Sequence, residues 1–80
     1  MTRVELIEMI ENGSDIMFSA AGRNYTILTW TEEGIAIGER FPNDHEIRYF
    51  TTAEELVDGF MIGGKSLGEQ AMEIRITEYT

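Results

Sequence analysis

The stretch that decides the predicted fold is residues 14–40, SDIMFSAAGRNYTILTWTEEGIAIGER. Apolar and polar residues alternate along three runs within it, 14–20, 24–31 and 35–40. A period of two is typical of strands that bury one face. Each gap between the runs contains a glycine, as tight turns between strands often do. The stretch therefore predicts a three-stranded antiparallel meander.

Turn chemistry predicts the register of the first two strands. A two-residue loop at Gly22-Arg23, with glycine at the first central position, would pair Ala20 with Tyr25. Phe18 would then lie opposite Ile27. Because side chains alternate along a strand, all of these residues share one face of the sheet.

The second turn must keep that face, since a slip of one residue moves every side chain to the other side. A two-residue loop at Glu32-Glu33 would set Trp30 opposite Ile35 and reverse the faces. A three-residue loop, with Gly34 as the left-handed residue of a bulge, pairs Thr31 with Ile35 instead. The predicted inner face consists of Ile16, Phe18, Ala20, Ile27, Ile35 and Ile37. The predicted second face consists of Asp15, Met17, Ser19, Thr26, Leu28, Trp30, Ala36 and Gly38.

The flanking segments predict helices and one more strand. Residues 2–12 read as an N-terminal helix, because Thr2 and Glu5 form a capping box ahead of an apolar stripe. Residues 45–50 alternate as an edge strand, with Ile47 and Tyr49 set against Glu46 and Arg48. A second helix is predicted over 53–61.

The C-terminal part predicts a third helix that begins at Ser66. Ser66 and Glu69 have the spacing of another capping box. Residues 74–79 also alternate with a period of two, so they continue the helix or leave it as a strand, and periodicity over so short a run leaves both open. The predicted fold class is α+β: an N-terminal helix, a four-stranded mostly antiparallel meander sheet and two C-terminal helices.

Composition limits the functional classes. Fifteen Asp and Glu against six Lys and Arg give the 80 residues a net charge of -9, and there is no cysteine. A chain of this length predicts a single domain, residues 1–80. The excess of carboxylates disfavours direct binding to nucleic acid or anionic membranes, and it favours either solubility alone or attraction to a protein partner with basic surface. No apolar run reaches the roughly 18 residues of a membrane span, and we expect a soluble, cytoplasmic protein.

One motif matches a nucleotide-binding expression. Residues 59–66, GFMIGGKS, satisfy the phosphate-loop pattern G-x-x-x-x-G-K-[ST], with Lys65 and Ser66 at its end. That pattern requires a buried strand before the loop and a helix after it. Here the preceding element is predicted to be an amphipathic helix. We therefore interpret Gly63-Gly64 as a helix end and Ser66 as the N-cap of the next helix, and predict no cofactor.

Metal-ligating and catalytic patterns are equally weak. Asp44, His45 and Glu46 are adjacent, but neighbouring residues of a strand point to opposite faces, and His45 is the only histidine. No serine has the surroundings of an activated nucleophile. We predict no metal site, no catalytic residue and no enzyme activity.

Two surfaces remain as candidate partner-binding sites. Met17, Leu28 and Trp30 gather on the second sheet face, and contiguous exposed apolar surface often marks an interface. This cluster is exposed if the helices all cover the other face, and buried if the first helix or the C-terminal tail covers it; the sequence leaves both open. The other candidate is acidic, with Glu54, Glu55 and Asp58 on the second helix.

The runs 49–60, YFTTAEELVDGF, and 62–67, IGGKSL, resemble a recurrent segment of small acidic uncharacterised proteins from Gram-positive bacteria and their mobile elements. Residues 12–15, NGSD, and 34–39, GIAIGE, fit the same resemblance. Those proteins have no assigned activity, so the resemblance implies a fold and no catalytic residue. It also favours interpreting the Gly-Lys-Ser match as a helix junction.

In size, charge and element order the chain is also similar to small anti-CRISPR proteins whose carboxylates imitate DNA. That similarity is architectural and transfers no residue. The function predicted from the sequence is a non-enzymatic protein-binding or accessory module of a bacterial mobile element. The alternative is an acidic nucleic-acid mimic that inhibits a basic nuclease.

Overall fold

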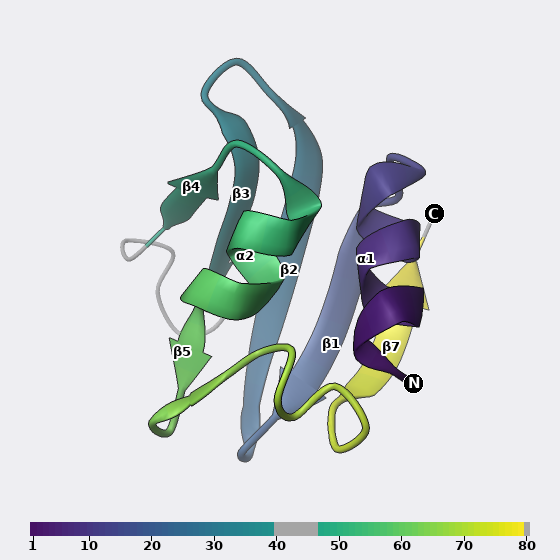
Figure 1. Ribbon diagram of the computed structural model, residues 1–80, viewed down its shortest axis with the longest axis vertical. Helices are drawn as coiled ribbons and strands as arrows, with labels where there is room; N and C mark the ends of the chain where they lie inside the picture. Colours follow the sequence, from purple (N-terminus) through teal and green to yellow (C-terminus); the bar gives the residue numbers. More distant parts are fainter. Residues whose placement is uncertain (40–46, 80) are drawn as a thin grey trace.

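A five-stranded antiparallel sheet of order β4-β3-β2-β1-β7 forms the body of the protein (Figure 1). The structure, a computed structural model, describes residues 1–39 and 47–79, with the backbone alone described at Trp30. The strands are β1 (Ile16–Ala20), β2 (Arg23–Thr31), β3 (Gly34–Glu39), β4 (Arg48–Phe50) and β7 (Arg75–Tyr79).

Two helices, α1 (Arg3–Glu11) and α2 (Ala53–Gly59), lie against one face of this sheet (Figure 1). A small hairpin of β5 (Met61–Ile62) and β6 (Lys65–Ser66) follows α2. The helices, the hairpin and the turns after it bury one continuous core against the sheet. That core consists of Leu6, Ile10, Ile16, Phe18, Ala20, Tyr25, Ile27, Ile37, Ala53, Leu56, Val57, Phe60, Ile62, Leu67, Ala71 and Ile74.

The first helix begins where the sequence predicts. The Thr2 backbone N–H donates to Glu5 Oε1 at 2.8 Å, and Glu5 N–H donates to Thr2 Oγ1 at 3.1 Å, so the capping box is present. Hydrogen bonding to the Glu5 carboxylate, first from the Thr2 backbone N–H and then from the Thr2 side chain, lowers the pKa of Glu5. Leu6 and Ile10 are buried, which confirms the apolar stripe.

The meander is confirmed, but the predicted register of its first hairpin is wrong by two residues. The turn is Ala21-Gly22, with φ of 52° and 77°, rather than Gly22-Arg23. Ala20 therefore pairs with Arg23, and Phe18 pairs with Tyr25. Two left-handed residues match the twist of flanking strands in a two-residue hairpin. A shift of two residues preserves the period, so the inner face is the one predicted.

The predicted three-residue loop at 32–34, with Thr31 opposite Ile35, is wrong, although Ile37 still shares a face with Ile27 as predicted. Thr31 pairs with Gly34 across a two-residue turn at 32–33, and the extra residue lies in β2, where the register shifts between Leu28 and Thr31. This bulge within β2 keeps Ile37 on the same face as Ile27, which is the effect that was predicted for a bulge at the turn. Ile37 pairs with Ile27 in the core, and Ile35 packs against that core.

The prediction of four strands and two C-terminal helices is wrong. Among the described residues, α2 is the only helix after the meander. Residues 67–73, where the third helix was predicted, form consecutive turns. The fifth strand is β7, which pairs with the free edge of β1, so residues 75–79 are a strand. The helix predicted over 53–61 ends at Gly59. The predicted edge strand is confirmed over Arg48–Phe50, while residues 45 and 46 lie outside the described residues.

The predicted cap of the third helix nevertheless forms. Ser66 N–H donates to Glu69 Oε1 at 3.1 Å, and Glu69 N–H donates to Ser66 Oγ at 3.2 Å. The chain then turns toward the end of α2, where Leu67 N–H donates to Phe60 O at 2.9 Å and Gly68 N–H donates to Val57 O at 2.8 Å. A Cβ at Gly68 would lie 2.8 Å from Val57 Cγ1, so this approach requires a glycine. Buried Gln70 closes the turns by donating from Nε2 to carbonyls of the hairpin, among them Ile62 O at 2.9 Å and Lys65 O at 3.0 Å.

Candidate functional site

The face of the sheet opposite the helices is the principal candidate site, and we call it the open face. Core residues of α1, α2 and the turns after β6 all pack on the inner face (Figure 1). The C-terminal tail, as β7, extends the sheet edge rather than crossing the second face. No helix of the described residues covers the open face, which settles the alternative that the sequence left open.

Strand pairing fixes which side chains the open face presents. Thr26 pairs with Met17 on one side and with Gly38 on the other. Ala36 pairs with Leu28 on one side and with Tyr49 on the other. Leu28 is 44% exposed and Tyr49 is 47% exposed, so apolar surface of β2 and β4 is accessible to a partner.

A hollow of about 210 Å³ lies in the open face. Its floor follows β3, where the small residues Ala36 and Gly38 alternate, and larger side chains of the neighbouring segments rise beside it. Ile47, which is 44% exposed, stands on one side and Leu28 on the other. The hollow is lined by Thr26, Leu28, Ala36, Ile37, Gly38, Glu39 and Ile47.

One polar atom in the lining has no protein partner. The Thr26 hydroxyl oxygen is buried and makes no hydrogen bond. Leaving a buried hydroxyl unpaired costs free energy, commonly about 1–3 kcal/mol. A ligand or partner group that enters the hollow with a donor or an acceptor would recover that hydrogen bond.

The apolar residues predicted as a site are placed as follows. Met17 and Leu28 lie on the open face, on the neighbouring strands β1 and β2. Trp30 belongs to β2, and its side chain is outside the described residues. Sequence reasoning missed Ile47 and Tyr49 as members of this face. Their alternation with Arg48 was visible, but the pairing of β4 with β3 was needed to assign them to a face.

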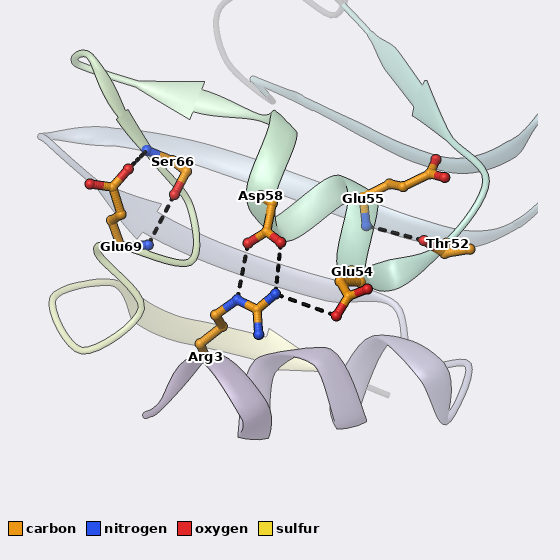
Figure 2. A network of polar contacts seen from close by, with 7 residues as sticks. All are labelled: Arg3, Thr52, Glu54, Glu55, Asp58, Ser66 and Glu69. Atoms are coloured by element: carbon orange, nitrogen blue, oxygen red, sulfur yellow. Dashed lines mark hydrogen bonds and ion pairs between the residues drawn. The ribbon is translucent and has the colours of Figure 1, made fainter.

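The acidic residues predicted on the second helix lie on α2, on the other side of the molecule (Figure 2). Arg3 of α1 donates from Nε to Asp58 Oδ1 at 3.0 Å and from Nη2 to Asp58 Oδ2 at 2.7 Å. Arg3 Nη2 also lies 3.6 Å from Glu54 Oε2. Two of the three predicted carboxylates are therefore paired with a cation, and Glu55 carries no ion pair among the described residues.

The Arg3–Asp58 pair predicts a pH dependence of stability. The hydrogen bond from Arg3 lowers the pKa of Asp58, so its contribution is complete above the unfolded pKa of about 4. That contribution is lost as the pH falls through the lower pKa of the folded state. We expect Asp58→Asn to lower the Tm at neutral pH, and the difference from wild type to shrink toward about pH 2.

Thermal unfolding followed by circular dichroism across this pH range measures the effect. Glu55→Gln is the matched control, because it removes one carboxylate from the same helix without breaking a described ion pair. A Tm difference of equal size and equal pH dependence in both variants would contradict the assignment and point to net charge alone.

The phosphate-loop match has a different structure from the predicted helix junction. Gly63 and Gly64, with φ of 63° and 86°, form the tip of the β5-β6 hairpin, and Lys65 pairs with Ile62. The Ser66 hydroxyl oxygen accepts a hydrogen bond from Glu69 N–H. The interpretation as a helix junction is therefore wrong, and the strand-loop-helix geometry of a phosphate loop is absent from these residues.

Among residues 1–39 and 47–79, no three His, Asp or Glu side chains gather as metal ligands do. The sequence Asp44-His45-Glu46 lies outside the described residues. Neither α1 nor α2 has the length and continuous apolar sequence that crossing a membrane requires, and the described residues contain no other helix. Comparisons of the chain with protein-family models, with curated proteins and with solved structures find no match.

Proposed function

We propose that this chain is a non-enzymatic protein-binding module and that the open face of the sheet is its contact surface. The observation that carries the proposal is the placement of both helices on the same face. A sheet with two apolar faces ordinarily buries both against other elements. Here the second face keeps accessible apolar side chains on neighbouring strands, with a hollow between them.

The chemistry of the hollow supports binding rather than catalysis. Among the described residues, the lining of the hollow is mainly aliphatic, and Glu39 is the only ionisable residue in it. Glu39 pairs with Tyr25, which belongs to the inner core, so its side chain is on the helix side of the sheet. The open face thus offers shape and apolar area, which are the usual determinants of a protein interface.

The nucleic-acid mimic is the alternative that the net charge of -9 supports. Its predicted carboxylates on α2 are less available than the sequence implies, since Arg3 holds Asp58 and approaches Glu54. An apolar interface and a charge mimic also differ in salt dependence, because salt screens exposed charges and leaves apolar burial intact. One capture experiment therefore separates them.

Proteins are captured with the tagged chain from a lysate of the organism that encodes it, at about 50 mM and about 1 M salt. We expect capture to persist at high salt and to fall at least about tenfold for Leu28→Lys, which places a charge on the contact surface. Met72→Lys is the matched control, because Met72 is 79% exposed and lies in the turns after β6, outside the strands that form the open face. The mimic predicts the opposite pattern: capture is lost at high salt, is lost in the double variant Glu54→Gln plus Glu55→Gln, and is unaffected by Leu28→Lys. That result would contradict the proposal.

A further inference from the structure

Charge is distributed unevenly between the two sides of the sheet. The helical side carries Glu5, Glu8 and Glu11 on α1 and the acidic residues of α2. The open face has an uncharged centre on its four adjacent strands and the residue before β4, with Asp15 before β1 and Arg75 and Glu78 of β7 at its margin. That centre consists of Met17, Ser19, Thr26, Leu28, Ala36, Gly38, Ile47 and Tyr49. Two copies of the chain can therefore bring their open faces together while most carboxylates stay on the outer sides.

The relief of the open face is self-complementary. Leu28, which protrudes, pairs directly across the strands with Ala36, which is 5% exposed and forms part of the floor of the hollow. A two-fold axis parallel to the strands, passing between β2 and β3 at this pair, exchanges the two positions. It would set Leu28 of each copy over Ala36 of the other.

We propose that the partner of the open face is a second copy of this chain, packed face to face about this axis. The inference rests on the proposed function, because it takes the open face as the contact surface. In this arrangement β2 of each copy crosses over β3 of the other, and β1 crosses over β4. Met17 then meets Ile47 of the second copy. The two sheets pack about 10 Å apart as in a β-sandwich, with the helices outside.

The size of the face predicts a weak dimer. Four to five strands at about 4.8 Å spacing and about five residues long give a face of roughly 20 by 17 Å. Such a face, about 340 Å² on each copy, is well below the roughly 800 Å² per partner of standard specific interfaces and is typical of weak, transient contacts. We therefore expect dissociation in the micromolar range, so that the monomer and the dimer both occur at accessible concentrations.

Sedimentation equilibrium of the whole chain, from about 10 µM to about 1 mM, tests the proposal. The apparent mass is expected to rise toward twice that of the monomer. Leu28→Ala leaves a gap at each contact and Ala36→Leu overfills it, so each variant alone is expected to dimerise at least about tenfold less well. The double variant, and an equimolar mixture of the two single variants, restore one large and one small residue at each contact and are expected to recover dimers.

A cross-linking experiment with the folded protein gives a second measurement. The chain has no cysteine, so a mixture of Leu28→Cys and Ala36→Cys chains is expected to give the mixed dimer with a short thiol-specific cross-linker. Leu28→Cys mixed with Met72→Cys is the control and is expected to give none. Circular dichroism of each variant confirms that it is folded before either measurement.

A wild-type chain that stays monomeric at about 1 mM overturns the inference, as does a double variant that dimerises no better than the single variants. The proposed function fails separately. A monomeric chain that captures another protein through a Leu28-dependent contact refutes the dimer and retains the binding module. A chain that neither dimerises nor captures a protein refutes both.

Discussion

Gly34→Ala is expected to destabilise the protein by roughly 2–4 kcal/mol, although the substitution adds a single methyl group. Gly34 has φ of 119°, a conformation that residues with a Cβ rarely adopt. The added Cβ would lie 2.6 Å from the backbone oxygen of Phe50, an atom that cannot move without shifting β4. Strained backbone and a clash with the neighbouring strand therefore add together.

Thermal unfolding measures this effect, and a fall in Tm of order 15 °C is expected for a domain of this size. Gly22→Ala is the matched control, because Gly22 also has positive φ, at 77°, but a Cβ added there would have nothing within 4 Å. That control isolates the cost of the left-handed backbone, about 1 kcal/mol. Equal losses in the two variants would show that the approach of Gly34 to Phe50 contributes nothing.

Phe18→Ala is expected to remove most of the stability of the domain. Phe18 is fully buried in the middle of β1 and stacks on Tyr25, with ring centroids 5.3 Å apart. Truncating a buried phenylalanine costs about 3–5 kcal/mol, because apolar burial is lost and a cavity is left. An 80-residue domain has only about 4–12 kcal/mol of stability in total.

Urea unfolding followed by circular dichroism tests this expectation. With a slope of about 1 kcal/mol per molar urea, the midpoint is expected to fall by about 3 M or the unfolded form to dominate in buffer. Met72→Ala, at a methionine that is 79% exposed, is the control and is expected to leave the midpoint unchanged. A small effect at Phe18 would contradict its place at the centre of the core.

The parts of the fold that depend on period were predictable from the sequence. The inner face of the meander survived two errors of turn geometry, because each error preserved the alternation of Phe18, Ile27 and Ile37. The N-caps at Thr2 and Thr52 were equally predictable, since a cap requires only residues three apart. Glu55 N–H donates to Thr52 Oγ1 at 3.1 Å across that spacing.

The C-terminal part was not predictable in the same way, because its structure depends on distant contacts. The cap of Ser66 forms, but a cap specifies where a helix begins and not that the helix continues. Residues 75–79 become a strand because β1 offers a free edge; the Thr77 hydroxyl donates to Met17 O, 60 residues away in sequence. A local pattern contains no information on that edge.

The sequence predicted the residues of the candidate site that lie on β1 and β2, but it did not predict whether they are exposed. Alternation alone placed Met17 and Leu28 on a common face, opposite Phe18. Whether α1 covered that face depended on packing between helices, which includes the contact of Arg3 with Asp58. The same packing placed the paired carboxylates and the open face on opposite sides of the molecule.

The bulge of β2 has a consequence for insertions and deletions in this chain. The extra residue lies within the strand, between Leu28 and Thr31, while the turn at 32–33 is as short as a hairpin allows. Deleting one residue from the bulge would leave a regular ladder in which Thr31 still lies opposite Gly34 and Leu28 still lies opposite Ala36. Every later side chain of β3 would keep its face, because the residue removed has no partner of its own. The loss of one residue from this hairpin is therefore expected to be tolerated within the strand and not at the tip, where the turn is already of minimal length.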